Sequence, residues 1–504
     1  MEDMLRKELL SDALNGKISV DSLKQTLSGE KDVVTDSISQ EGECLFMMAE
    51  SKKGQVLVAA SQSQEALSGF SGDSMTVSHC KEPFYAVVCP LSHDNAISLR
   101  KALPRTAPSV LDCRESFGTG DRIGNTAPAT PGHIAALDNT GMTPVLAQQS
   151  VRENHKTGRT YEEVMDDVTW TVFRTGYDQP WGSDADHQKN IEEIEESVKA
   201  GFTLFTLDPS DLIDNAADTD SEAVLKEKLG RLFKEERNAY EMISRYEFDG
   251  ADRIAAARSA VKYTGAIRHA VTAYRRLTEL LGESGFNFEL SIDETSTTTT
   301  ALDHRMIATE CIREGVNLFS LAPRFEGAFE KGIDYIGSID AFRWSLKTHV
   351  ELSRELGDYR LSLHSGSDKF SVYPIFGELT DGFFHIKTAG TSYLEAVKVA
   401  AHADMNLFRR ILELSLETFE ENAASYEISA NAENVPSPAD LGSDSAIKEI
   451  EDNPDMRQVL HIAFGVVLDG MGGELRALLS ANADTYKDYL VRHIGRHVAG
   501  LRGK

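Results

Sequence analysis

The chain contains few cysteines, a deficit of positive charge and no long apolar segment. Its 5 cysteines are odd in number and form no C-x-x-C pair, so neither a disulfide framework nor a zinc–thiolate site is indicated. Lys and Arg number 52 against 80 Asp and Glu, a formal charge of −28. A nucleic-acid or anionic-membrane partner needs clustered cations, so we expect neither.

The sequence also lacks the signals of membrane insertion and of several common enzyme classes. No run of about 18 apolar residues occurs, so no transmembrane helix is predicted. The first residues, MEDMLRK, lack the apolar core of a signal peptide. There is no G-x-S-x-G elbow or H-E-x-x-H helix, and Gly118–Gly124 misses the dinucleotide-binding spacing. We expect a cytoplasmic protein whose surface permits either a monomer or a homo-oligomer.

Short β-rich runs that end in polar residues alternate with helical patterns from about residue 110 onward. The predicted strands are 110–116, 143–148, 202–208, 286–293, 316–322, 360–365 and 383–388, with a weaker candidate at 169–174. Eight parallel strands alternating with helices are typical of a (β/α)8 barrel. The sequence therefore predicts an α/β fold built on a TIM-type barrel.

Three regions are predicted along the chain. Residues 1–109 form a small N-terminal α/β region, with a helical start at 4–28 and strands at 55–60 and 84–90. Residues 110–395 form the catalytic barrel, and a Glu-, Lys-, Ala- and Leu-rich segment at about 221–284 is a helical insertion in it. Residues 396–504 form a C-terminal helical region.

Histidines and carboxylates cluster at the predicted carboxyl ends of the strands, where a barrel builds its active site. His187, His364 and His385 lie at three such ends. Imidazole and carboxylate groups together suit a divalent transition metal, namely Mn, Ni, Co, Zn or Fe. A lone strand histidine is more often structural, but three beside carboxylates favour a metal site.

Two carboxylates are the best candidates for proton transfer. Asp186 and Glu294 lie beside the histidines, and a nearby cation with partial burial can give them opposite protonation states. The alternative is that Asp186 caps the following helix and Glu294 forms a salt bridge in the barrel. Cations that can hold an anionic substrate lie nearby, although each alone could form a surface ion pair. They are Arg122, Arg152, Arg324, Lys369 and Lys387.

Several long strings together resemble the tagaturonate epimerase family of hexuronate catabolism. They are RESFGTGDR at 114–122, AQQSVREN at 147–154, DADH at 184–187, TLDPSD at 206–211, HSGSDKFSVYP at 364–374 and FHIKTAGTSY at 384–393. The resemblance covers residues 110–470. The family is metal-dependent and interconverts D-tagaturonate and D-fructuronate, two 2-ketohexuronates that differ in configuration at C4.

The resemblance implies roles for individual residues. It assigns Asp186 and Glu294 as the acid–base pair and His187, His364 and His385 as metal ligands. The expected contacts to an anionic sugar-acid substrate are Arg122, Gln148, Arg152, Ser365, Asp368, Lys369 and Lys387.

The reaction itself restricts the mechanism. C4 is β to the ketone, so its hydrogen is not acidic and simple enolisation cannot invert it. Transient oxidation by a nicotinamide needs a dinucleotide site, which the sequence lacks. We therefore favour a metal-assisted retro-aldol/aldol route. The alternatives are a metal-dependent keto-sugar-acid isomerase or aldolase, and a non-catalytic sugar-acid-binding protein.

Overall fold

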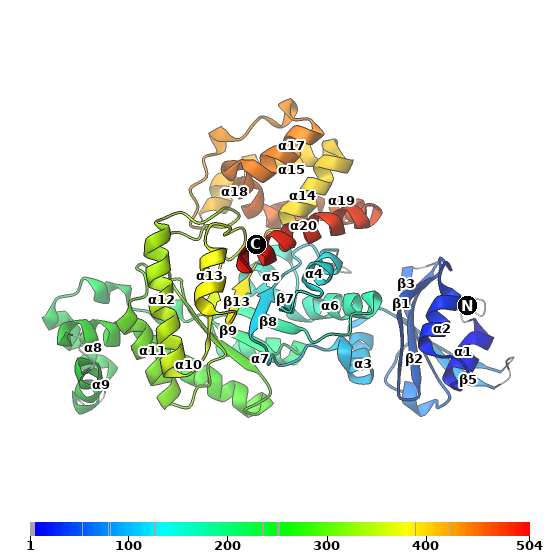
Figure 1. Cartoon of the computed structure of the whole chain (residues 1–504), viewed down its shortest axis with the longest axis horizontal. Coiled ribbons are helices and arrows are strands. Elements are labelled where there is room, and N and C mark those ends of the chain that lie inside the picture. The colour runs from blue at the N-terminus through cyan, green and yellow to red at the C-terminus, as the bar shows by residue number, and fades with distance from the viewer. Residues whose placement is uncertain are drawn as a thin grey trace.

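The computed structural model describes residues 6–52, 54–78, 80, 82–124, 128–233, 236–248, 252–388, 390–424 and 426–503, without the side chains of 236 and 248. Residues 4 and 5 of the predicted helical start, and residues 234, 235 and 249–251 of the predicted insertion, lie outside the described residues. Figure 1 shows a central barrel with an N-terminal sheet at one end, helices α8 and α9 at the other, and C-terminal helices above it.

Eight parallel strands close the central barrel in the order β10-β11-β12-β13-β6-β7-β8-β9. The strands are β6 (Glu115–Gly118), β7 (Thr143–Ser150), β8 (Gly182–Gln188), β9 (Leu204–Leu207), β10 (Asn287–Ile292), β11 (Ser320–Pro323), β12 (Arg360–Leu363) and β13 (Phe384–Lys387). This closure confirms the predicted TIM-type barrel, and it brings the carboxyl ends of all the strands to one face.

The weak strand candidate at 169–174 is wrong. These residues belong to α6 (Tyr161–Thr175), which begins with a capping box between Thr160 and Glu163. The missing barrel strand is β8, which contains two aspartates and a histidine. Its sequence has little strand character because its polar side chains face the barrel interior and are held there by charged partners. The first strand also lies later than expected, at β6 rather than at 110–116.

Helices surround the barrel and bury their apolar faces against it. They are α4 (Thr130–Leu137), α5 (Val151–Thr157), α6, α7 (Ile191–Ala200), α10 (Arg253–Leu281), α11 (Ala301–Arg313), α12 (Ile339–Leu356) and α13 (Tyr373–Thr380). The segment predicted as a helical insertion contains α8 (Glu222–Leu232), α9 (Glu236–Phe248) and α10. Apolar residues of these three helices join the barrel core, including Leu225, Ile243 and Ala266.

The N-terminal sheet is antiparallel, with the order β1-β2-β3-β5-β4. Its elements are α1 (Lys7–Leu14), α2 (Val20–Leu27), β1 (Val33–Glu41), β2 (Cys44–Ser51), β3 (Gly54–Ser61), β4 (Asp73–Val77), β5 (Phe84–Pro90) and α3 (His93–Ala102). Leu10 and Leu23 of α1 and α2 pack on one face. The other face packs against α3 and against Trp170 and Phe173 of the barrel helix α6.

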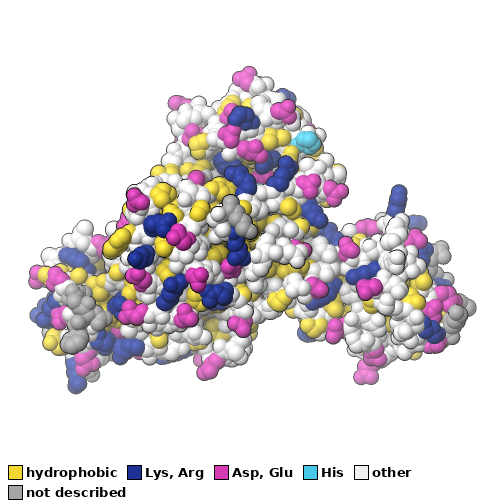
Figure 2. Space-filling view, viewed as in Figure 1, with side chains coloured by type: hydrophobic (Ala, Val, Ile, Leu, Met, Phe, Trp, Pro, Cys, Tyr) yellow, Lys and Arg dark blue, Asp and Glu magenta, His cyan; other side chains and the backbone are white. Residues whose placement is uncertain are grey.

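The C-terminal helices lie over the barrel (Figure 1). They are α14 (Ser392–Ala403), α15 (Met405–Glu417), α16 (Phe419–Ala423), α17 (Ser443–Asp452), α18 (Pro454–Ile462), α19 (Phe464–Ala481) and α20 (Ala483–Leu501). None of the described helices is long and apolar enough to cross a membrane. Acidic and basic side chains are interspersed over the face in Figure 2.

Candidate functional site

A pocket of about 600 Å³, a volume that includes its opening to solvent, lies at the carboxyl ends of the barrel strands. Residues of the barrel form most of its wall, and the C-terminal region contributes Tyr426 and His461. The lining residues are Arg122, Gln148, Ser150, Arg152, Glu153, Asp186, His187, Lys331, Gly332, His364, Ser365, Ser367, Lys387, Gly390, Tyr426 and His461. The C-terminal helices therefore complete a site that the barrel begins.

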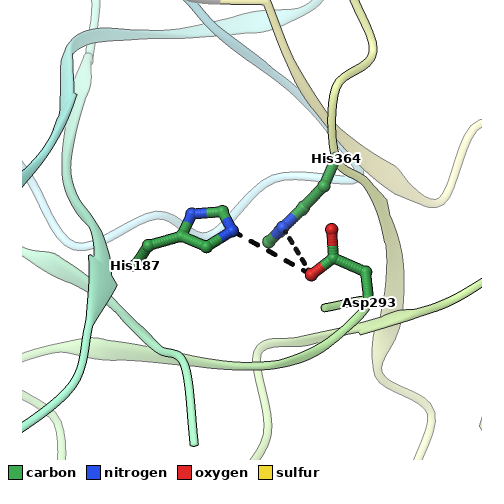
Figure 3. Close-up of side chains that lie close together, drawn as sticks. All are labelled: His187, Asp293 and His364. Carbon is green, nitrogen blue, oxygen red and sulfur yellow. Dashed lines mark ion pairs between the residues drawn. The ribbon is translucent and has the colours of Figure 1, made fainter. Parts of the chain in front are cut away.

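Two histidines and an aspartate from three strand ends converge beside this pocket (Figure 3). His364 Nδ1 lies 3.3 Å from Asp293 Oδ1, and His187 Nε2 lies 4.0 Å from the same oxygen. His187 Nε2 also lies 4.0 Å from Glu294 Oε1. These are the side-chain types that hold a divalent transition metal, so the group can serve as a metal site.

The far nitrogen of each histidine is hydrogen-bonded to a second carboxylate. His187 Nδ1 donates to Asp186 Oδ1 at 2.8 Å, and His364 Nε2 donates to Glu289 Oε1 at 2.6 Å. The near nitrogen of His364 is buried and forms no hydrogen bond within the described part of the chain. Such carboxylate–histidine pairs fix the ring and leave the other nitrogen free as a ligand, which is the usual arrangement around bound metals.

The backbone near this cluster departs from regular geometry. The pairing of β8 with β9 shifts register between Ala185 and Gln188, and His187 adopts a left-handed conformation with φ 51°. Ser365, directly after His364, has φ 48°. Bulges re-aim side chains, and non-glycine residues at positive φ are concentrated at functional sites. The irregularity turns the His187 ring toward Asp293.

Lys387 lies at the centre of the buried charges. Its Nζ is 2.7 Å from Asp184 Oδ2, 2.7 Å from Asp186 Oδ1 and 2.8 Å from Glu289 Oε1. These carboxylates raise its pKa well above the ordinary lysine value, although burial, the largest single effect, acts in the opposite direction. The ammonium therefore stays protonated and acts as a fixed charge.

The carboxylates around Lys387 differ in pKa. Burial raises the pKa of Asp184 to about 6. Burial also opposes ionisation of Asp186, but His187 and Lys387 together hold the pKa of its carboxyl well below the usual value. Asp186 is consequently ionised at neutral pH and able to accept a proton. Asp186 also lines the pocket.

Glu294 and His385 lie outside this immediate cluster. The Glu294 side chain is 39% exposed and lies 3.9 Å from Arg152, at the rim. His385 is fully buried in the interior of β13, where its Nδ1 is hydrogen-bonded to Ser116 Oγ at 2.9 Å. Burial lowers its pKa to about 4. It precedes Lys387 by two positions, so it faces the same way one layer deeper in the barrel.

Of the predicted substrate contacts, Arg122, Gln148, Arg152, Ser365 and Lys387 line the pocket. Arg122 is paired with Glu153 and contacts His461.

Asp368, Lys369 and Arg324 do not line the pocket. Asp368 Oδ2 lies 2.8 Å from Arg457, and Lys369 donates to backbone carbonyl oxygens. Arg324 contacts the Thr295 carbonyl oxygen and, at 3.4 Å, Glu427. These three side chains hold loops in place.

Several site residues were not selected from the sequence. They are Asp184, Glu289 and Asp293 in the barrel, and Glu153, Lys331, Tyr426 and His461 around the pocket. Strand alternation could have identified residues of the first group. Side chains two positions apart share a face, so Glu289, Ser291 and Asp293 lie on one face of the strand and Glu294 on the other. No local pattern marks the second group, which tertiary packing brings to the pocket.

The chain is similar to proteins of one enzyme family over nearly its whole length. The model of the tagaturonate epimerase family (UxaE) matches residues 34–501, a longer range than the 110–470 expected. A curated tagaturonate/fructuronate epimerase of Thermotoga maritima is 39% identical over 483 residues, which are 94% of this chain and 97% of that protein.

Solved structures of the same family are also similar to this chain. Fructuronate-tagaturonate epimerase UxaE from Cohnella laeviribosi, in a complex with one glycerol, is 34% identical, with a TM-score of 0.84 over 96% of this chain and 99% of that chain. Its native structure is 33% identical, with the same TM-score of 0.84 and the same coverage of 96% and 99%. The family model matches residues 34–501, and the curated relative is 39% identical over 94% of this chain. Together with the barrel and the cluster at its strand ends, these matches show that the chain belongs to the tagaturonate epimerase family.

Proposed function

We propose that this chain interconverts D-tagaturonate and D-fructuronate by inverting the configuration at C4. The observation that carries the proposal is the position of the Asp186 carboxylate, which lies in the pocket beside His187, His364 and Asp293. The family membership and the curated relative from Thermotoga maritima support the choice of substrate.

The donor set fits a divalent metal ion. His187, His364 and Asp293 would hold it, with Glu294 close enough to join them. Asp293 thus takes the third position that the sequence pattern assigned to His385. Two imidazoles and a carboxylate suit Mn, Fe, Co, Ni or Zn. When bound, such an ion supplies Lewis acidity toward oxygen atoms of the substrate.

Asp186 is the proposed base. Its carboxylate accepts the proton of the C4 hydroxyl, the C3–C4 bond breaks, and the bonding electron pair moves toward the C2 carbonyl. The new C4 aldehyde turns to present its other face before the bond re-forms. Asp186 then returns the proton to the C4 oxygen, so the reaction needs no net acid or base. Glu294, on the rim, is the second group proposed to move protons.

Lys387 supports this chemistry without becoming a nucleophile. An amine nucleophile must be unprotonated, whereas the three surrounding carboxylates keep Lys387 charged. Its ammonium instead holds Asp186 and Glu289 in place, and Glu289 orients His364. We therefore expect no covalent imine with the substrate.

The test incubates metal-loaded and EDTA-treated protein with D-tagaturonate and follows D-fructuronate by chromatography. The proposal predicts metal-dependent product, with no deuterium entering carbon from D2O. Deuterium at C1 or C3 together with a different product would instead indicate a keto-sugar-acid isomerase. No product with Mn, Fe, Co, Ni or Zn would overturn the proposal.

A further inference from the structure

Lys331 differs from the other cations that line the pocket. Arg122 is paired with Glu153, Lys387 with three carboxylates, and Arg152 lies 3.9 Å from Glu294. Lys331 is half-buried and forms no ion pair with a carboxylate in the part of the chain that the structure describes. Its ammonium is thus the pocket cation that remains available to an anionic ligand.

The surroundings of Lys331 form a positive part of the pocket wall. His461 is buried there, and burial, followed by the charges of Arg122 and Lys331, holds its pKa well below the usual value. A neutral imidazole adds no charge of its own, so Lys331 supplies the positive charge of this part of the pocket. Glu153 is already bound by Arg122 through Nε at 2.7 Å. Lys331 also lowers the pKa of the Glu153 carboxyl, but less than Arg122 does, and among the described residues its ammonium forms no ion pair of its own.

Buried hydrogen bonds fix the segment that carries Lys331. Lys369 Nζ donates to the carbonyl oxygens of Glu330 at 2.8 Å and Ile333 at 2.5 Å. From α18, Arg457 Nε donates to the Gly332 carbonyl oxygen at 2.6 Å, and Gln458 Nε2 donates to that of Lys331 at 3.2 Å. The backbone is held from the barrel side and from the C-terminal side, while the Lys331 side chain lines the pocket.

We propose that Lys331 binds the carboxylate of the hexuronate and so determines that the enzyme prefers an acidic sugar to a neutral one. The inference rests on the proposed function, because it concerns the orientation of that substrate. With the C6 carboxylate bound to Lys331, the C4 hydroxyl would face Asp186, since both side chains line the same pocket.

The chemistry of the reaction favours a lysine in this position. Cleavage of C3–C4 separates a three-carbon aldehyde, C4 to C6, that keeps the carboxylate. This fragment must stay bound while its aldehyde turns about the C4–C5 bond. An ammonium is a point charge and tolerates such a rotation, whereas a bidentate guanidinium fixes the plane of its carboxylate.

The experiment compares wild type, Lys331→Met and the control Lys347→Met with two substrates. Lys347 lies on α12 with a side chain that is 63% exposed. The substrates are D-tagaturonate and D-tagatose, which has a hydroxymethyl group in place of the carboxylate. Steady-state kinetics and calorimetric binding are measured for each pair. The substitution is expected to raise KM and Kd for D-tagaturonate about 10- to 100-fold, and to change those for D-tagatose by less than about threefold.

Each outcome has a distinct meaning. Equal losses with both sugars in Lys331→Met, or no loss with D-tagaturonate, would overturn the inference. Lys331→Arg keeps the charge, so it is expected to retain the preference for D-tagaturonate. A wild-type urea midpoint for Lys331→Met shows that this variant folds. If wild type does not convert D-tagaturonate, the proposed function is wrong. Calorimetry still shows whether binding of the two sugars depends on Lys331.

Discussion

The Asp186 carboxylate accepts two hydrogen bonds on one oxygen. His187 Nδ1 and Lys387 Nζ lie 2.8 Å and 2.7 Å from Oδ1. This pairing keeps the group ionised inside the barrel, where burial alone would favour the neutral acid. A single side chain thereby orients a candidate metal ligand and provides a proton acceptor.

Asp186→Asn removes the proton acceptor and preserves the shape of the side chain. We expect kcat for C4 inversion to fall by about 10²- to 10⁴-fold. Asp452→Asn, at a position 63% exposed on α17, is the matched control and should retain wild-type kcat. An unchanged kcat in Asp186→Asn would show that another group accepts the proton.

Glu289 is a positioning residue, since it acts through His364. Its Oε1 accepts the Nε2 hydrogen of His364 at 2.6 Å. Glu289→Gln should weaken the affinity for a divalent metal about 10- to 100-fold, the usual effect of losing a carboxylate behind a histidine ligand. Calorimetric titration of the metal-free variant measures this directly, and an affinity equal to that of wild type would refute the role.

The candidate site could be predicted only in part. His187, His364 and Asp186 follow from their types and their place at strand ends. Asp293 directly follows β10, and continuing the alternation of that strand puts it on the same face as Glu289, whereas Glu294 falls on the other face. Lys331 and His461 carry no local signal at all, because the packing of α18 against the segment before α12 creates their neighbourhood.

Among the elements, β8 and α6 show why a polar strand is hard to predict from the sequence. Most of β8 is buried although it contains Asp184 and Asp186. Buried parallel strands normally read as apolar runs. This strand is an exception because Lys387 from β13 forms ion pairs with both of its carboxylates. The apolar run at 169–174 looked more like a strand, yet its capping box and its 3.6-residue period belong to α6.

Helices α13 and α20 pack closely enough to require a glycine. A Cβ atom at Gly377 would overlap the backbone carbonyl oxygen of Leu501 at the end of α20. Gly377→Ala should therefore lower the free energy of unfolding by about 1–3 kcal/mol, as overpacking does elsewhere.

Urea denaturation measures this loss. Gly473→Ala in α19, where an added Cβ meets nothing within 4 Å, is the control and should not destabilise the protein. Equal midpoints for the two variants would contradict the close packing of α13 on α20.

At the scale of the whole molecule, several histidines are buried in neutral form. Burial lowers the pKa of His133 to about 4 and that of His349 to about 4. Below the unfolded value of about 6.5, the unfolded chain binds protons that the native protein does not. The contribution of these groups to stability is full above about pH 6.5 and is lost as the pH falls toward about 4.

The midpoint of urea denaturation should therefore fall between about pH 7 and about pH 4.5. His349→Gln should narrow this difference, because one neutral imidazole is removed from the core. His402→Gln, at an exposed position, should leave it as in wild type. If the urea midpoint changes by the same amount between the two pH values in all three proteins, the buried neutral histidines do not cause the change.

His187, His364 and Asp293 are proposed to hold a catalytic divalent ion beside Asp186. The most direct measurement titrates Mn²⁺ or Zn²⁺ into EDTA-stripped protein by calorimetry while epimerase activity is followed in parallel. The account predicts that wild type binds a single equivalent and regains activity in step, and that Asp293→Asn binds at least about 10-fold more weakly. Full activity in stripped protein, or equal affinity in Asp293→Asn, would contradict it.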